Sequence, residues 1–288
     1  MMAGSSRVAV VTGASSGIGK EVAKALARQG FSVIGTGRDP ERIAAAEAEI
    51  RAVSSGGSVH MLRADLSLIA EAERTAHDIA ALTDHVDILV NNAGGMASEQ
   101  VMTAEGHEAN FAGNHLGPFV LTRALLPLLR AAAAKSPPAS VRIINTSSDA
   151  SEMIPTINLD DLESLGAFNP GLAYCTGKLA NVLFARALAT RLAGEGIVAH
   201  SVHPGAVDSN FFSYAPAATR ERTKDMPKFS TEEGGDTLIW LATSEEGGEN
   251  SGSYWHQRKL RAPNPLVDND AIVERFWRES ERLVSGRP

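Results

Sequence analysis

The 288-residue chain has very little cysteine, few aromatic residues and no long apolar run. Its single cysteine, Cys175, cannot form an intramolecular disulfide, and the sequence has no C-x-x-C pair or His/Cys cluster that would indicate zinc. We therefore expect no metal and a reducing compartment. The apolar run at residues 8–11 is too short for a signal peptide or a membrane span. This predicts a soluble, cytoplasmic protein without a membrane anchor.

The chain also lacks a basic block, since Lys and Arg total 27 against 34 Asp and Glu and the formal net charge is −7. Proteins that follow a phosphate backbone need clustered positive charge, so we expect no nucleic-acid partner. The length suffices for a substantial core, and no repeat or linker divides the sequence. We expect a single domain over residues 1–288, with a substrate-covering loop at about 206–230.

What the sequence has is an alternation of short β-branched runs with longer Ala-rich stretches. Strands are expected at RVAVVT, FSVIGT, SVHML, DILV, VRIINTSS and IVAHSVH, with a short last one, SYWH, between two final helices. Helices are expected at 18–28, 40–53, 67–82, through LGPFVLTRALLPLLRAAA, and at about 172–193. Such a pattern predicts an α/β fold with a doubly wound parallel sheet, the Rossmann fold. Two long irregular segments, 149–171 and 206–230, are typical of functional loops.

The segment TGASSGIG follows the first expected strand and opens the first helix. Glycine there lets the backbone approach a pyrophosphate, and a helix N-terminus offers unpaired N–H groups to the anion. A plain tight turn would need the same glycines, but the flanking strand and helix favour a dinucleotide site. The candidate cofactor contacts here are Gly13, Ser15, Ser16, Gly17, Ile18 and Gly19.

The end of the second strand, TGRD, indicates which dinucleotide is bound. Gly37 stands where an NAD enzyme carries an acid for the ribose 2′-OH, and Arg38 offers donors that suit a 2′-phosphate. We therefore expect NADP(H), with NAD(H) as the weaker candidate. Asp39 can bind ribose, but we favour an N-cap for the helix that begins at Pro40. Asp65 can equally cap a helix or contact adenine.

Tyr174 and Lys178 are four positions apart in an expected helix, so they share one face about 6 Å apart along the axis. A nearby ammonium group stabilises phenolate and lowers the tyrosine pKa, as a general acid/base requires. A surface pair would show the same spacing. However, NNAG (91–94), NTSS (145–148) and HPGAVDS (203–209) all lie at strand ends, where ligands bind in open parallel sheets. Cys175 points elsewhere, about 100° round the helix.

With these motifs the chain resembles the short-chain dehydrogenase/reductase family over essentially its whole length, and in particular its retinol dehydrogenase and WW-domain oxidoreductase branch. The resemblance implies hydride transfer between a carbonyl and its alcohol, with Tyr174 as proton donor and Lys178 holding the nicotinamide ribose. It also implies that Ser148 binds the substrate oxygen, with Ser147 as the alternative. Asn114 would anchor a water chain that relays protons through Lys178.

The resemblance extends the set of expected cofactor contacts and sets the chain apart from shorter members. The further contacts are Leu66, Asn92, Ala93, Gly94, Thr146, Pro204, Gly205, Val207 and Ser209, together with Tyr174, Lys178 and, in one of its two readings, Asp65. Ser148 and Tyr174 are 26 positions apart, about twice the common spacing, as in the longer loop of the retinol dehydrogenase-like branch. The anchor of the branch's membrane-bound members is missing, so membrane-dissolved retinoid is not the expected substrate.

Aromatic residues in the segment 210–229 bear on the substrate. Phe211, Phe212, Tyr214, Met226 and Phe229 can close over a hydrophobic ligand or pack into the core, and we favour the first role. We expect a mostly apolar ketone, aldehyde or alcohol, reduced in the cell. The alternative functions are a non-catalytic nucleotide-binding regulator or scaffold, and a C=C reductase. Apolar helix faces at 111–133 and 174–193 favour a homo-oligomer.

Overall fold

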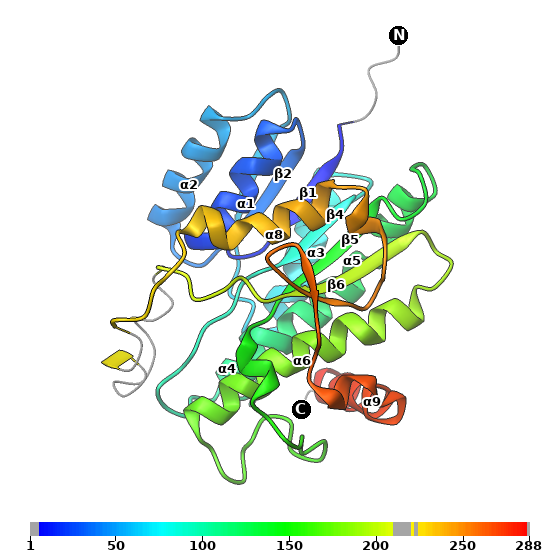
Figure 1. The fold of residues 1–288 in the computed structure, drawn as a ribbon. Coiled ribbons are helices and arrows are strands. Elements are labelled where there is room, and N and C mark those ends of the chain that lie inside the picture. Colours follow the sequence, from blue (N-terminus) through cyan, green and yellow to red (C-terminus); the bar gives the residue numbers. More distant parts are fainter. Residues whose placement is uncertain (1–5, 210–219, 222–223, 287–288) are drawn as a thin grey trace.

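The computed structural model describes residues 6–209, 220–221 and 224–286. Its centre is an eight-stranded sheet in the order β3-β2-β1-β4-β5-β6-β7-β8, with helices on both faces (Figure 1). All neighbouring strands are parallel except β7 and β8, which form an antiparallel hairpin. The strand order reverses between β1 and β4, which is where such sheets open a crevice for ligands. The predicted doubly wound sheet is confirmed.

The bounds of the elements follow the sequence pattern closely. The strands are β1 Val8–Val11, β2 Ser32–Gly37, β3 Val59–Arg63, β4 Ile88–Asn91, β5 Val141–Thr146, β6 Ile197–Val202, β7 Tyr254–His256 and β8 Lys259–Arg261. The longer helices are α1 Gly17–Arg28, α2 Pro40–Ala52, α3 Ile69–Leu82, α5 Gly117–Ala133, α6 Pro170–Arg191, α8 Thr231–Thr243 and α9 Asp270–Ser285. Short turns are α4 Ala109–Phe111, the π-helical η1 Ala112–Leu116, and the 3₁₀ turns η2 Asp149–Glu152, η4 Glu246–Gly248 and η5 Pro265–Asp268. The strand β8 and the π-helical turn were not predicted.

The core lies on both sides of the sheet. Every residue of β4, β5 and β6 is buried, as expected for parallel strands that are covered on both faces. Leu89 packs with α3, α5 and α6 on one side, whereas Val90 packs with α1 and α8 on the other. This alternation aims the side chains at the strand ends in opposite directions, which matters for the two serines after β5.

The C-terminal helix α9 packs across α6 (Figure 1). Phe276 and Trp277 join an aromatic cluster with His115, Phe119 and Phe184, and His115 Nε2 lies 2.8 Å from Ser280 Oγ. The stretch 109–133 is long and apolar enough to cross a membrane, but 56% of its most apolar window is buried inside the protein. The sequence suggested that the α5 and α6 faces pair with a second copy of the chain. Helix α9 covers part of this surface, so it is not wholly open to such a copy.

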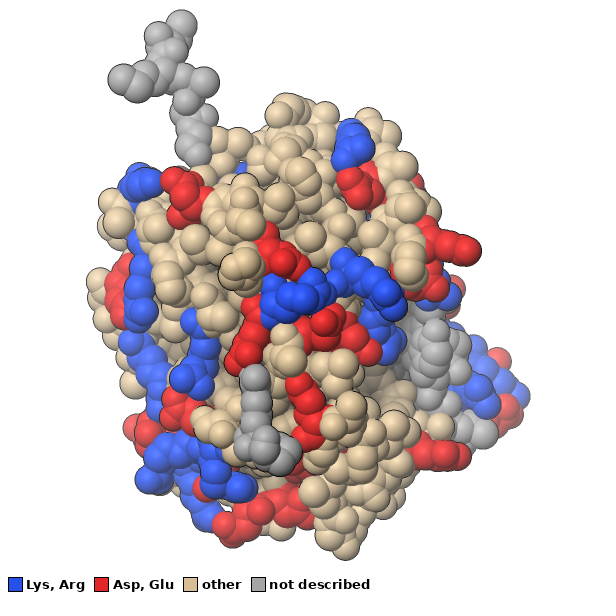
Figure 2. Space-filling view, turned by 180° about the vertical axis from the view of Figure 1, so that it is seen from behind, with Lys and Arg blue, Asp and Glu red and all other residues tan. Residues whose placement is uncertain are grey.

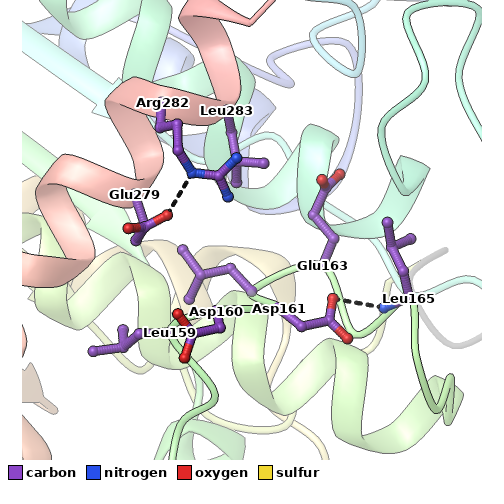
Figure 3. A pocket seen from close by; sticks show the side chains of 9 residues that line it. Leu159, Asp160, Asp161, Glu163, Leu165, Glu279, Arg282 and Leu283 are labelled. Atoms are coloured by element: carbon purple, nitrogen blue, oxygen red, sulfur yellow. Dashed lines mark hydrogen bonds and ion pairs between the residues drawn. The ribbon is translucent and has the colours of Figure 1, made fainter.

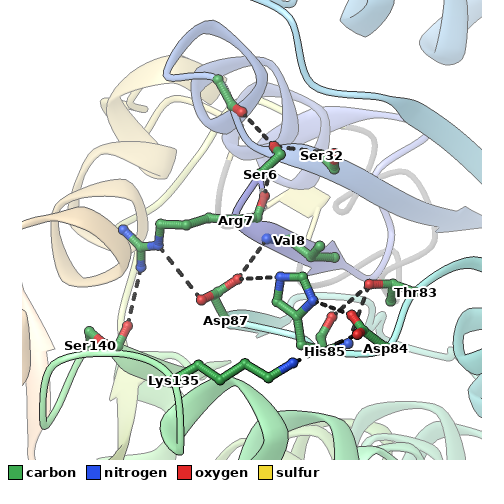
Figure 4. Close-up of polar contacts among 11 residues, drawn as sticks. Ser6, Arg7, Val8, Ser32, Thr83, Asp84, His85, Asp87, Lys135 and Ser140 are labelled. Carbon is green, nitrogen blue, oxygen red and sulfur yellow. Dashed lines mark hydrogen bonds and ion pairs between the residues drawn. The ribbon is translucent and has the colours of Figure 1, made fainter. Parts of the chain in front are cut away.

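Polar contacts fasten the start of β1 to β4 and β5, at the edge opposite the glycine turn (Figure 4). Asp87 Oδ2 accepts a hydrogen bond from Val8 N at 2.7 Å, and Arg7 donates to Ser140 O at 3.2 Å. On the face drawn in Figure 2, Lys and Arg are interspersed with Asp and Glu, so the surface charge there is mixed in sign.

Candidate active site

The glycine turn between β1 and α1 has the shape that a dinucleotide needs. Gly13 and Gly17 adopt φ values of +68° and +57°, where a side chain is strained. A Cβ on Gly19 would lie 2.4 Å from Gly13 O, so only glycine fits there. Around Gly17 the nearest atom to such a Cβ is 3.7 Å away, on Ser209. Backbone is therefore exposed to a ligand at the start of α1, and the residues fit a pyrophosphate.

Three other predicted contacts of this segment lie around the turn in different roles. Ser16 is the N-cap of α1, but its side chain makes no capping hydrogen bond. The first N–H groups of a helix have no intrahelical partner, so here the Ser16 side chain does not occupy them. Ser15 Oγ lies against Gly37, 2.7 Å from where a Cβ would sit on that glycine. The Ile18 side chain instead packs against α8. Only its backbone can take part in binding.

The loop after β4 is tied to the glycine turn by Thr12, whose role was not predicted. Thr12 Oγ1 accepts hydrogen bonds from the N–H groups of Asn92 and Ala93, both at 2.9 Å. Asn92 Nδ2 donates to Thr12 O at 3.1 Å, and Thr146 Oγ1 donates to Asn92 Oδ1 at 3.4 Å. The Asn92 amide thus braces the two loops. The TG and NNAG motifs indicated that both loops belong to the site, but not which of their groups form these hydrogen bonds.

The end of β2 carries the expected arginine and a second one beside it. Asp39 accepts a hydrogen bond from Arg42 N at 2.9 Å with Pro40 following it, so the predicted N-cap is confirmed. Arg38 is exposed, and Arg63 Nε donates to Arg38 O at 3.3 Å. Arg63 comes from β3, where it pairs in register with Gly37, and sequence reasoning missed it.

Asp65 and Leu66 follow β3, and the structure bears on one of the two predicted roles of Asp65. Asp65 Oδ1 accepts hydrogen bonds from Ser67 N and Oγ, at 3.1 and 2.7 Å, and does not cap α3. Glu105 takes that role by accepting from the first N–H groups of the helix. Of the two predicted roles of Asp65, the cap is therefore wrong, because a distant loop supplies the carboxylate, and the contact with adenine stays a prediction. Leu66 is 5% exposed with its side chain in the core, so only its backbone could meet a ligand.

Tyr174 meets Ser148 at the carboxyl end of β5. The Ser148 hydroxyl lies close enough to the Tyr174 phenol to lower its pKa, and Lys178 Nζ lies 5.6 Å from the centre of the Tyr174 ring. Ser147 Oγ turns the opposite way and donates to Lys178 O at 2.7 Å inside the protein. Since neighbouring residues at a strand end face opposite sides, Ser148 is the serine that faces the phenol. The structure brings together Ser148, Tyr174 and Lys178.

Asn114 approaches Lys178 from the π-helical turn η1. Its Nδ2 donates to Gly95 O and to Asn110 O and Oδ1, each at 2.8 Å. Its Oδ1 is buried and has no hydrogen-bond partner among the described residues. A Cβ on Gly94 would lie 2.5 Å from that oxygen and 3.3 Å from Lys178 Nζ. Both polar atoms therefore face the space above Gly94, which suits a ribose hydroxyl or a water.

The pKa of Tyr174 is shifted upward, contrary to the prediction. Burial is the largest cause, the hydrogen bond with Ser148 opposes it, and the negative charge of Asp149 adds to it. Burial also lowers the pKa of Lys178 to about 8, and its Nζ donates to Thr146 O at 3.3 Å. The i, i+4 pair does meet in the structure, but burial dominates the pKa of the phenol and the ammonium group is not among its main causes.

The turn after β6 closes the site on the side of α8. Gly205 has φ +90°, and a Cβ there would lie 2.3 Å from the Phe229 ring, so this aromatic covers the turn that starts at Pro204. Val207 is buried and forms a parallel bridge with Phe229. Met226 is 47% exposed. The expected lid residues Phe211, Phe212 and Tyr214 lie outside the described residues.

A pocket of about 200 Å³ lies elsewhere, between the loop before α6 and helix α9 (Figure 3). Its lining includes Asp160, Asp161, Glu163 and Arg282, and none of the predicted site residues. Glu163 accepts a hydrogen bond from Glu108 N at 2.8 Å, so its carboxylate is already used within the fold. The pocket is separate from the Ser148–Tyr174 site.

Comparisons with known proteins agree with this geometry. The family model for short chain dehydrogenases matches residues 7–219. The chain is 36% identical to human retinol dehydrogenase 13, covering 96% of this chain and 84% of the relative, and 37% identical to human retinol dehydrogenase 12, covering 98% and 87%. Mouse polyprenol dehydrogenase is 34% identical, with coverages of 96% and 84%.

Among solved structures, the fold is similar to an uncharacterized protein from Mycobacterium paratuberculosis, with TM-score 0.75, 29% identity and coverages of 97% and 93%. It is also similar to the RhlG/NADP active-site complex of Pseudomonas aeruginosa, with TM-score 0.69, 30% identity and coverages of 89% and 95%.

Proposed function

We propose a specific reaction for this chain, which belongs to the short-chain dehydrogenase/reductase family. Membership makes it an oxidoreductase that binds NAD(P) and interconverts an alcohol and a carbonyl compound of small size. Beyond this, we propose that it uses NADP(H), that Tyr174 is the general acid/base, and that the substrate is mostly apolar. The meeting of Ser148, Tyr174 and Lys178 at the carboxyl end of β5 carries the proposal.

The proposed roles follow from the positions of the polar atoms. In reduction, Tyr174 gives its proton to the carbonyl oxygen while Ser148 Oγ holds that oxygen. Lys178 Nζ and Asn114 Oδ1 face the space above Gly94, so Lys178 binds the ribose and passes a proton back to the phenol, while Asn114 Oδ1 accepts from the water that resupplies that proton. The bound dinucleotide supplies or accepts the hydride.

The preference for NADP(H) is supported by the cations at the end of β2. Arg38 is exposed there, Arg63 lies beside it, and no acid stands at Gly37. Replacing Arg38 with alanine should weaken NADPH binding by roughly 10- to 100-fold, which is the contribution of one or two charge-assisted hydrogen bonds. The affinity for NADH should stay nearly unchanged. Arg28→Ala, at the far end of α1, is the control. Equal losses for both dinucleotides would contradict the NADP assignment.

The apolar substrate is supported by the relatives, which are named for the long apolar alcohols retinol and polyprenol. Phe229 over Gly205 and the exposed Met226 add apolar surface near the site. We expect this protein, which we propose to be cytoplasmic, to reduce decanal with NADPH faster than the small charged acid pyruvate. Preference for pyruvate would refute this assignment.

The decisive test is Tyr174→Phe, with binding and turnover measured separately. The variant should lose turnover of decanal while it binds NADPH as tightly as the unaltered protein. Persisting turnover would remove Tyr174 from the mechanism. If the unaltered protein bound NADPH but turned over no carbonyl or alcohol in the series, the non-catalytic binder would be the better description.

A further inference from the structure

Asp149 directly follows Ser148 and is hydrogen-bonded to it. Ser148 Oγ donates its single proton to Asp149 Oδ1 at 2.9 Å, and the same serine lies close enough to Tyr174 to affect the pKa of the phenol. Because η2 packs against α6 and Ser148 stands between the two groups, the Asp149 carboxylate lies roughly 6 Å from the phenol oxygen, about two polar contacts away. A negative charge therefore stands next to the two groups that would hold the substrate oxygen.

Among the described residues around Asp149, no cation is hydrogen-bonded to its carboxylate, and Arg261 acts on it only through the longer-range attraction of their charges. His203, after β6, accepts from Asp149 N at Nδ1 (3.2 Å), and its Nε2 is 3.8 Å from Asp149 Oδ2, too far for a hydrogen bond. Burial lowers the pKa of His203 to about 4, so the ring is neutral at neutral pH. Arg261, on β8, is engaged by Glu152 in a two-bond ion pair at 2.6 and 2.9 Å.

The other titratable groups around Tyr174 are few in the described part of the chain. Lys178 and Cys175 belong to its own helix, and Asp149 comes from η2, packed against that helix. Glu152 lies in the same short turn as Asp149, but its charge acts on His203 and Arg261. Asp149 is thus the carboxylate that the phenol experiences.

We infer that Asp149 is a positioning residue that orients the Ser148 hydroxyl and keeps the Tyr174 phenol protonated, so that the site favours carbonyl reduction over alcohol oxidation. The inference rests on the proposed function, because it takes Tyr174 to be the proton donor. Reduction needs the phenol and oxidation needs the phenolate, so one nearby negative charge helps the first and opposes the second. The raised pKa of Tyr174, to which Asp149 contributes, agrees with this direction.

The size of the effect follows from Coulomb's law in a partly solvated site. A unit charge at roughly 6 Å, with an effective dielectric constant between about 40 and 80, moves a titration by roughly half to one pH unit. The Asp149 side chain is 61% exposed, which argues for the lower half of that range. Removing the charge should therefore raise oxidation roughly three- to sixfold at a pH below the phenol titration, with reduction equal or slower.

The experiment compares Asp149→Asn, Asp149→Glu and the control Glu152→Gln in the full chain. Rates with decanol and NADP⁺, and with decanal and NADPH, are measured between pH 6 and 10. Asp149→Asn should move the rise of oxidation to lower pH and increase the oxidation-to-reduction ratio at least threefold. Asp149→Glu should restore the original profile, and Glu152→Gln, which removes an equal charge from the same turn, should leave it unchanged.

Each outcome has one meaning. The inference is overturned if the pH profile of Asp149→Asn does not move, or if the profile of Glu152→Gln moves equally. It is also overturned if Asp149→Asn lowers oxidation and reduction alike, which is what a purely structural residue would do. Tyr174→Phe is assayed alongside. If that variant remains active, the proposed function has failed; if it is inactive while Asp149→Asn leaves the profile unmoved, only the role of Asp149 has failed.

Discussion

Replacing Lys178 with methionine should make the folded protein more stable at neutral pH while it abolishes turnover. The Lys178 residue is 4% exposed, and burial lowers its pKa from 10.5 to about 8. This difference corresponds to about 3 kcal/mol of free energy that the folded state loses by holding a desolvated ammonium group. Methionine has similar length and no charge, so it removes this penalty.

The sign of the pH dependence follows from proton binding. Between about pH 8 and 10.5 the unfolded chain binds more protons at Lys178 than the folded one, so the unaltered protein gains stability as pH rises through that window. The advantage of Lys178→Met should fall from about 3 kcal/mol at pH 7 to about 1 kcal/mol at pH 10. The lost bond to Thr146 O reduces this little, because Asn181 Nδ2 still donates to that oxygen at 2.9 Å.

Urea unfolding at pH 7 and pH 10 measures this directly, with Lys178→Arg and Lys135→Met as controls. Lys178→Arg keeps the charge and should gain nothing. Lys135, whose side chain is 67% exposed, should change stability by less than about 0.5 kcal/mol when replaced. A Lys178→Met protein that is less stable than the original at pH 7, or whose advantage does not shrink at pH 10, would refute the reasoning.

Two further predictions test the geometry of the site and of the C-terminal helix. Gly94→Ala places a methyl group 2.5 Å from Asn114 Oδ1 and should lower kcat roughly 100-fold. In the control Gly95→Ala, where a Cβ meets nothing within 4 Å, kcat should stay within about twofold of the original. Similar kcat values for the two variants would contradict this arrangement of Asn114 and Gly94. Phe276→Ala should lower the free energy of unfolding in urea by about 3–5 kcal/mol. By opening the α5/α6 surface it should also promote dimers in size-exclusion chromatography. A loss under about 1 kcal/mol would mean that α9 is not held by its aromatic residues.

The sheet and its helices could be predicted from the sequence because each element carries a local signal. Asp39–Pro40 supplies an N-cap and a first helical residue, and α2 begins there. Asn169–Pro170 does the same for α6, which begins two residues before the predicted start at 172. Strand β8 has no such signal: it is three residues long and exists because it pairs with β7. Pairing between distant or short segments is a tertiary property, which periodicity alone does not report.

The site was predictable in spacing but less so in the role of each group. Motif order brought Ser148, Tyr174, Lys178 and Asn114 into one set, yet the choice between Ser147 and Ser148 needed the face on which each serine lies. The sequence offered Asp65, the nearest acid, as one candidate cap of α3, whereas Glu105 supplies the cap from 36 residues away. Local rules rank nearby partners first, so they fail wherever a loop returns from a distance.

The pKa of Tyr174 shows why charge at a site is harder to predict than position. A helix of known spacing predicts that an ammonium group lies near the phenol. The pKa of each group, however, depends on how much water it retains, and this depends on segments such as η2 and η1 that pack against α6 from elsewhere in the chain. Burial acts on Lys178 and Tyr174 in opposite directions, lowering one pKa and raising the other, so the two groups come closer to their neutral forms. A single partly exposed carboxylate, Asp149, then has a measurable influence, because burial of the phenol already favours its protonated form and the negative charge acts in the same direction.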